Sequence, residues 1–210
     1  MMKITIFGSS GRTGLPLVHQ ALEAGHQVTA YLRDPNKLAI KHPNLRVIQG
    51  NINDLSGIEK AVAGQDAVLS TLGAVPGGAK DIMTVAAKNI IAAMQKTGVQ
   101  RLITLTGAGV AQPGDQPKAI NNLISFMLRF LAKEVQLDAA EHVRLVRASS
   151  LDWTIVRVPM LTNAPSSGQL KVGMVGINDG MRIGRSEVAA FMLKTLETGT
   201  HRKAAPVISA

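Results

Sequence analysis

Short apolar runs alternate with longer segments of helical periodicity along most of the chain. Runs rich in β-branched residues predict strands, and segments with apolar residues three and four positions apart predict helices. The predicted strands occupy about 4–7, 27–32, 45–49, 67–73, 101–106 and 151–159, and the predicted helices about 12–24, 55–63, 81–96 and 186–198. This alternation is typical of an α/β fold in which a doubly wound, mostly parallel sheet carries helices on both faces. We expect the strand order 3-2-1-4-5 for its core.

The later part of the chain is less regular. Residues 110–118 form a Pro- and Gly-rich loop that could cover a substrate or simply connect two elements. Residues from about 119 to 148 predict a long helical region, of which 123–131 is apolar on more than one face. Beyond 160 the pattern indicates a short strand near 171–175, the helix at 186–198 and a final strand at 206–209.

The length of the chain is typical of a single domain. It has 210 residues and no Pro/Gly/Ser-rich linker, so we expect a single domain over 1–210. Its core would span about 1–160, and residues from about 161 to 210 would form a small C-terminal elaboration on the substrate side.

The first predicted strand runs directly into a glycine-rich turn. Gly8, Gly11 and Gly14 follow the pattern G-x-x-G-x-x-G between this strand and the first helix. The backbone N–H groups of such a turn and the positive end of the helix can hold a pyrophosphate, and the Ser10 hydroxyl can face a phosphate. The pattern alone also fits an ordinary strand-to-helix connection. With its position at the start of an alternating chain, it predicts a Rossmann-type dinucleotide site.

The end of the second strand carries charges that distinguish one dinucleotide from another. Arg33 and Asp34 lie about 20 residues after the glycine turn, where a side chain reads the adenosine ribose. Arg33, with Arg12 in the turn and Lys37 just beyond, supplies positive charge for a 2′-phosphate. We therefore expect NADP(H) to be favoured over NAD(H), while Asp34 leaves an NAD-type ribose contact open.

The charge and the residue composition of the chain indicate which kinds of ligand it could bind. The chain has 23 basic and 14 acidic residues, a formal charge of +9, but the basic residues are scattered and only 3% of residues are aromatic. This argues against nucleic acid and favours attraction of an anionic cofactor. The chain has no cysteine, so thiolate metal sites are excluded, and no metal site is predicted. No apolar run fits a membrane span or signal peptide, so we expect a cytoplasmic protein without a membrane partner.

Several segments together resemble a known family. The segments 8–14, 31–34, 62–68, 72–73 and 150–157 are similar to those of atypical short-chain dehydrogenases/reductases. The chain resembles the NADPH-dependent flavin reductases of this family, also called biliverdin reductase B, and the NmrA-like NAD(P)H-binding proteins. The resemblance covers nearly the entire chain. It implies a Rossmann-type fold and NADPH as cofactor, and it is less specific for the substrate.

The resemblance also implies a set of cofactor-binding positions. Those facing the phosphates would be Gly8, Ser10, Gly11, Arg12 and Thr13, and those facing the 2′-phosphate would be Arg33 and Lys37. The adenine would lie beside Asn51 and Ile52, where Asn51 replaces the usual aspartate of flavin reductases but can still hydrogen-bond an adenine edge. The middle of the cofactor would contact Leu72, Gly73 and Thr106. The nicotinamide would contact Pro159, Met160 and Leu161.

The chain departs from the family at the chemical end of the site. Flavin reductases place a serine after the strand-five threonine and a histidine after the strand-six proline, and here these positions are Gly107 and Met160. The Tyr-x-x-x-Lys pattern is also missing. The remaining catalytic candidates are Thr106, as an orienting group, and His142, as an acid, although a packing role is commoner for a helical histidine.

Two functions are compatible with these residues. One is an NADPH-dependent oxidoreductase that transfers a hydride to a flat acceptor such as a quinone or a flavin, with FMN or FAD as substrate rather than prosthetic group. The other is a noncatalytic NADP(H)-binding sensor of the NmrA-like type. The missing proton donors favour the sensor, and the short chain favours the reductase. The apolar segment 123–131 suggests a dimer, but both a monomer and a homodimer stay open.

Overall fold

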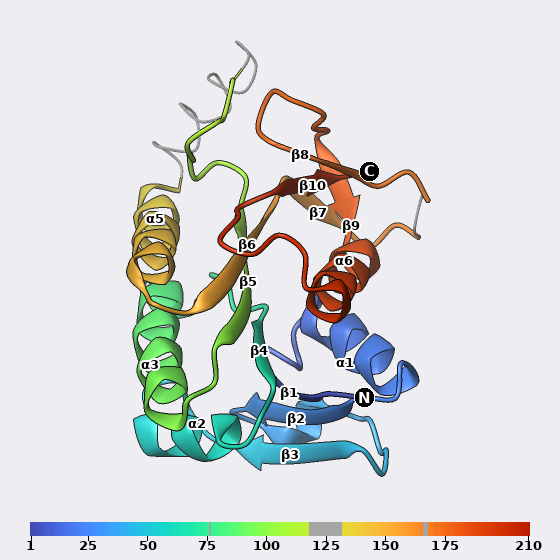
Figure 1. Cartoon of the computed structure of the whole chain (residues 1–210), viewed down its shortest axis with the longest axis vertical. Helices are drawn as coiled ribbons and strands as arrows, with labels where there is room; N and C mark the ends of the chain where they lie inside the picture. The colour runs from blue at the N-terminus through green and yellow to red at the C-terminus, as the bar shows by residue number, and fades with distance from the viewer. Residues whose placement is uncertain (76, 118–131, 166–167) are drawn as a thin grey trace.

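A mostly parallel sheet forms the centre of the computed structural model, which describes residues 1–75, 77–117, 132–165 and 168–210. Within these residues the sheet has eight strands in the order β3-β2-β1-β4-β5-β6-β10-β8 (Figure 1). They are β1 (Lys3–Phe7), β2 (Gln27–Leu32), β3 (Leu45–Gln49), β4 (Ala67–Ser70), β5 (Arg101–Gly107), β6 (Asp152–Val158), β8 (Lys171–Gly173) and β10 (Val207–Ser209). Neighbouring strands are parallel except β8, which is antiparallel to β10. The predicted order 3-2-1-4-5 is confirmed.

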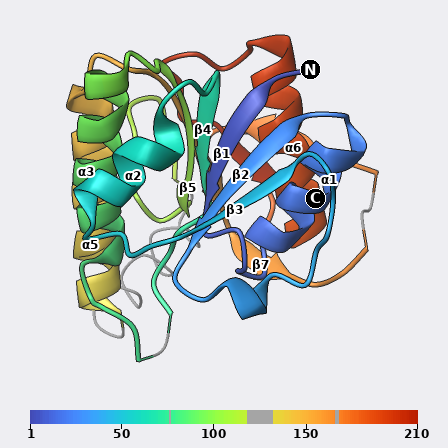
Figure 2. The same ribbon diagram turned by 90° about the horizontal axis from the view of Figure 1, so that it is seen from below.

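Helices cover both faces of the sheet (Figures 1 and 2). One face carries α1 (Gly14–Glu23) and α6 (Arg185–Thr198), and the other carries α2 (Leu55–Val62), α3 (Ile82–Thr97) and α5 (Lys133–Ala148). Successive strand residues point to opposite faces, so Ile4 and Ile6 pack in the cluster of α1 and α6, while Phe7 packs in the cluster of α2 and α3. Burial of both faces explains why the strands are apolar without alternation.

The differences from the predicted elements lie in short segments. β4 ends at Ser70 instead of 73, and a single turn of 3-10 helix spans Pro35–Lys37. A separate parallel pair of strands, β7 (Met160–Thr162) and β9 (Arg182–Gly184), was not predicted, because the hydrophobic pattern around these segments is irregular. Of the long helical region predicted from about 119, α5 covers 133–148, and the apolar segment 123–131 lies outside the described residues.

A buried ion pair anchors the loop that follows β5. The Arg157 guanidinium on β6 is fully buried and donates to both carboxylate oxygens of Asp115 at 2.8 Å. Burial acts to raise the pKa of Asp115, but hydrogen bonds from Arg157 and from backbone N–H groups outweigh it and hold that pKa below its usual value. Arg157 also donates to the Ala205 carbonyl at 2.7 Å. The loop is therefore tied to the sheet at 115.

Among the helices that the structure describes, none combines the length and the apolar content needed to cross a bilayer.

Candidate functional site

The predicted cofactor residues lie along one edge of the sheet. β1 to β6 are mutually parallel, so their carboxyl ends meet at the same edge. Each group of candidates follows or ends one of these strands, in the strand order Asn51, Arg33, Gly8, Leu72, Thr106 and Pro159. The order of the strands, not the order of the residues in the chain, brings these groups together. The carboxyl edge of a doubly wound sheet is where such folds bind nucleotides.

The glycine turn, residues 8–14, closes tightly between β1 and α1. Gly8 has a φ of 77°, which glycine adopts without strain, and the Gly11 N–H donates to the Gly8 carbonyl at 2.9 Å. A Cβ added at Gly14 would lie 2.0 Å from the Gly8 carbonyl oxygen. A side chain at Gly14 would therefore force α1 away from β1, which explains the requirement for glycine in the first turn of α1.

The amino end of α1 fits an anion. The first N–H groups of a helix have no partner within it, and Thr13 at the N-cap makes no side-chain capping hydrogen bond. Gly11 and Arg12 are exposed beside this end and Ser10 is half-buried. The Ser9 hydroxyl is buried and has no hydrogen-bond partner within the described residues. The turn thus offers donors and a positive helix end to a phosphate, as the sequence predicts.

Two cations at the end of β2 fit a 2′-phosphate. Arg33 and Lys37 are both exposed, and neither takes part in an ion pair within the described residues. The Arg33 carbonyl accepts a hydrogen bond from the Gln49 side chain of β3 at 3.2 Å, which holds the backbone there. Asp34, the alternative ribose partner, accepts from the Asn36 N–H at 3.1 Å and so caps the turn at 35–37. This arrangement leaves the two cations available to an anionic ligand.

The segment 51–54, which we call the adenine segment, is held from two sides. The Tyr31 hydroxyl on β2 donates to the Asn51 carbonyl at 3.0 Å, and the Asn89 side chain on α3 donates to the Ile52 carbonyl at 2.7 Å. Asn51 is exposed and Ile52 is buried, so the segment presents a polar side chain at the edge of the core. Tyr31 and Asn89 do not appear among the predicted site residues. Their contacts depend on packing between distant parts of the chain.

Thr71 links the end of β4 to the glycine turn. Its hydroxyl donates to the Phe7 carbonyl at 3.2 Å and to the Gly8 carbonyl at 3.3 Å. A Cβ added at Gly8 would lie 2.8 Å from the Thr71 Oγ1 atom. Leu72, next along the chain, is half-buried and Gly73 is exposed. The sequence analysis named Leu72 and Gly73 but not Thr71, whose role follows only from the proximity of β1 and β4.

The nicotinamide end combines apolar side chains with one unpaired hydroxyl. Thr106 is 3% exposed at the end of β5, and its Oγ1 has no partner within the described residues. Pro159 and Leu161 are half-buried, whereas Met160 is 61% exposed. The Met160 N–H donates to the carbonyl of Met181, which is 64% exposed. Two exposed methionines therefore lie close together where the resemblance implies the nicotinamide.

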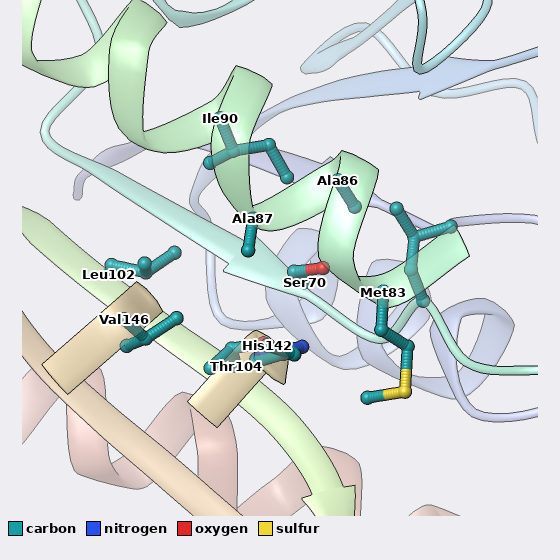
Figure 3. Close-up of a pocket in the computed structure, with 10 residues that line it drawn as sticks. Ser70, Met83, Ala86, Ala87, Ile90, Leu102, Thr104, His142 and Val146 are labelled. Carbon is teal, nitrogen blue, oxygen red and sulfur yellow. Dashed lines mark hydrogen bonds between the residues drawn. The ribbon is translucent and has the colours of Figure 1, made fainter. Parts of the chain in front are cut away.

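His142 lies in the layer of helices behind this edge (Figure 3). It is 4% exposed, its Nε2 lies 3.1 Å from the Thr104 hydroxyl, and burial lowers its pKa to about 4, although Asp138 acts to raise it. It lines a cavity of about 10 Å³ together with Ser70 and Leu72, about the space of one water molecule. His142 is thus neutral at physiological pH. This environment suits packing better than proton donation, and its catalytic role stays a prediction.

The chain is similar to proteins of known name. A 3-beta-hydroxysteroid dehydrogenase of Mycolicibacterium neoaurum is 29% identical over 140 residues, which cover 61% of this chain. The chain spans only about two fifths of that curated relative, 38% of its length.

Solved structures share the fold across the whole chain. A short-chain dehydrogenase/reductase from Veillonella parvula in complex with NADP has a TM-score of 0.83 at 21% identity, covering 100% of this chain and 94% of that one. ChuY, an anaerobilin reductase from Escherichia coli O157:H7, has a TM-score of 0.79 at 19% identity, covering 98% of this chain and 96% of that one. Residues 8–199 match the family model described as NAD(P)H-binding, and the chain therefore belongs to the NAD(P)H-binding family.

Proposed function

We propose that the protein is an NADPH-dependent reductase of a flat redox acceptor such as a flavin or a quinone. The observation that carries this proposal is the character of the nicotinamide end. It offers apolar side chains at Met160, Leu161 and Met181 and one unpaired hydroxyl at Thr106, but no acidic hydrogen placed for donation among the described residues. A flat aromatic acceptor needs a surface of this kind more than it needs a proton donor.

The preference for NADPH rests on Arg33 and Lys37. Both cations lack an acidic partner in the described part of the chain and follow β2, beside the glycine turn. A guanidinium binds a phosphate through paired, charge-assisted hydrogen bonds. One structure of this fold holds NADP, which supports the preference for NADPH. Another is named an anaerobilin reductase, which supports a reductase.

The residues of the chain would act mainly by positioning. NADPH, when bound, supplies the hydride, and this chemistry belongs to the cofactor. The glycine turn and α1 would hold the phosphates, Arg33 and Lys37 the 2′-phosphate, and the adenine segment the adenine. Thr106 would hydrogen-bond the nicotinamide side of the cofactor, and Met160 and Leu161 would exclude water from the face where the acceptor stacks.

Two side chains that could donate a proton, Tyr31 and His142, are hydrogen-bonded or buried away from the predicted nicotinamide position. The Tyr31 hydroxyl bonds to the Asn51 carbonyl, and burial, assisted by Asp54, raises its pKa. His142 is buried and its pKa is lowered to about 4. A carbonyl substrate would need a positioned acid, whereas a reduced flavin or quinone can take its proton from water. The chemistry of the site therefore favours acceptors of the second kind.

The same lack of a donor favours a second candidate, a noncatalytic NADP(H) sensor. The two are distinguished by following NADPH oxidation by the purified protein with FMN, riboflavin and a simple quinone in turn. Binding of NADPH and NADH is titrated in parallel. Turnover well above the protein-free rate supports the reductase and identifies the acceptor class. Tight NADPH binding without turnover on any acceptor contradicts the reductase and supports the sensor.

A further inference from the structure

The C-terminal elaboration brings an arginine to the glycine turn. β7 and β9 are parallel, and their last pair is Thr162 and Gly184. Asn163 and Arg185 come next in the chain and therefore leave the pair at the same end. Arg185 is the first residue of α6, which packs against α1. The Gln20 side chain of α1 donates to the Ser186 hydroxyl at 3.0 Å. The start of α6 is thereby held beside the helix that opens at the glycine turn.

The Arg185 side chain is oriented by Asn163. Its Nη1 atom donates to the Asn163 Oδ1 atom at 2.7 Å. Asn163 follows β7, directly after the segment 159–161 for which nicotinamide contact is predicted. Arg185 is half-buried, so its guanidinium is held in one direction without being shut off from solvent. Its guanidinium is thereby tied to the residue that comes two positions after the predicted nicotinamide segment.

Arg185 and Arg12 carry like charges. Burial lowers the pKa of Arg185, and the positive charge of Arg12 lowers it further. The start of α6, where Arg185 lies, is tied to α1 by the hydrogen bond from Gln20 to Ser186. Within the described residues neither arginine takes part in an ion pair. Two neighbouring cations that take part in no ion pair repel each other, and an anion bound beside both would remove that cost.

We infer that Arg185 is a cofactor-binding residue and that, together with Arg12, it holds the pyrophosphate of the dinucleotide. This inference rests on the cofactor site described above and names a contact that the sequence patterns do not indicate. The glycine turn and α1 supply backbone N–H groups to one side of the pyrophosphate, and Arg185 supplies a cation from the C-terminal elaboration. Asn163 is a positioning residue that holds the Arg185 guanidinium.

The pyrophosphate assignment has a signature different from that of the 2′-phosphate. NADPH, NADH and ADP-ribose all contain the pyrophosphate, whereas adenosine 2′-monophosphate contains only the phosphate assigned to Arg33. Arg185→Gln is expected to weaken NADPH, NADH and ADP-ribose by a similar factor, about tenfold or more, and to leave adenosine 2′-monophosphate unchanged. Arg33→Ala is expected to show the converse, with NADPH and adenosine 2′-monophosphate weakened most.

Lys194→Gln is the matched control. It removes the same charge from an exposed position on the same helix, nine residues after Arg185, and is expected to leave all four affinities within about twofold of the parent. Arg185→Lys keeps the charge but not the paired donors, and is expected to recover part of the binding. Melting of the cofactor-free protein checks the fold. Arg185→Gln is expected to melt close to the parent, because the lost hydrogen bond to Asn163 and the relieved repulsion from Arg12 act in opposite directions.

Three outcomes would overturn the inference. They are unchanged NADPH and NADH affinities in Arg185→Gln, a loss confined to NADPH, and a loss reproduced in full by Lys194→Gln. All readouts are binding measurements. Failure of every acceptor to be reduced would therefore contradict the proposed reductase and leave the assignment of Arg185 intact. Unchanged binding in Arg185→Gln together with normal turnover would contradict the assignment of Arg185 and leave the proposed reductase intact.

Discussion

The side-chain hydroxyl of Tyr31, on β2, donates a hydrogen bond to the backbone carbonyl of Asn51, at the end of β3. The ring of Tyr31 is 3% exposed and packs against Phe7 with ring centroids 5.4 Å apart. A Cβ added at Gly50 would lie 2.1 Å from the Tyr31 oxygen, so the backbone passes directly over the hydroxyl. The only tyrosine of the chain therefore fixes the adenine segment and is unavailable as a proton donor.

Tyr31→Phe should loosen the adenine segment while keeping the packed ring. The change removes one buried hydrogen bond and leaves the Asn51 carbonyl without that donor, which costs about 1 kcal/mol of unfolding free energy. We expect a lower urea midpoint and an affinity for NADPH reduced a few-fold, measured by denaturation and by fluorescence titration. An unchanged affinity for NADPH would show that the segment does not contact the adenine.

Arg33→Ala should discriminate between the two dinucleotides. If its guanidinium binds the 2′-phosphate, the loss amounts to about 2 kcal/mol, or about thirtyfold, for NADPH and much less for NADH. Lys41→Ala, a change at another exposed cation in the same part of the chain, serves as the control. Equal losses for NADPH and NADH in Arg33→Ala would contradict the 2′-phosphate assignment.

His142 should make the fold sensitive to mild acid. Its folded-state pKa of about 4 lies below the ordinary histidine value of 6.5, so the folded state binds fewer protons than the unfolded state between these values. This pKa difference contributes about 3 kcal/mol to the free energy of unfolding. The contribution is fully present above the pKa of the unfolded state and is lost as the pH falls toward the pKa of the folded state.

His142→Gln keeps a polar group near Thr104 and removes the titration. The difference in unfolding free energy between parent and variant is therefore expected to shrink on going from neutral pH to mildly acidic pH, as measured by urea unfolding. The exposed His42→Gln should show no such change. A parent-to-variant difference independent of pH would mean that His142 titrates normally in the folded state.

Asp138→Ala should destabilise α3, although Asp138 itself lies on α5. From α5, its carboxylate accepts hydrogen bonds from the N–H groups of Met83 at 3.0 Å and Thr84 at 2.8 Å, and so caps the start of α3. We expect a loss of about 2 kcal/mol by urea unfolding, because two N–H groups lose their acceptor.

Asp81→Ala is the matched comparison for Asp138→Ala. Asp81 occupies the N-cap position of α3 in the sequence but makes no side-chain capping hydrogen bond. Its replacement is expected to cost no more than about 0.5 kcal/mol. A larger effect at Asp81 than at Asp138 would reverse the assignment of the cap.

Much of the architecture could be predicted from local patterns in the sequence. Strands β1 to β6 and helices α1, α2, α3 and α6 lie close to their predicted positions, because each element is long enough to show its own period of apolar residues. The tight turn between β1 and α1 was predicted from the spacing of its glycines. Gly8 has a positive φ, and a side chain at Gly14 would collide with the Gly8 carbonyl. The role of this turn in holding a phosphate stays a prediction.

Other features depended on contacts between residues far apart in the chain. Asp138 caps α3 from a position 55 residues away from Met83. The start of α6, with Arg185, lies beside α1 only because α6 returns to pack against it. The strands β7 and β9 come from separate segments of the chain and pair only with each other. The sequence by itself determined the fold class and the order of the first strands, because these follow from local periodicity, and it placed the predicted cofactor residues on strands whose ends share one edge. Only the tertiary structure decided which side chains surround the site, because those contacts arise where separate elements pack together.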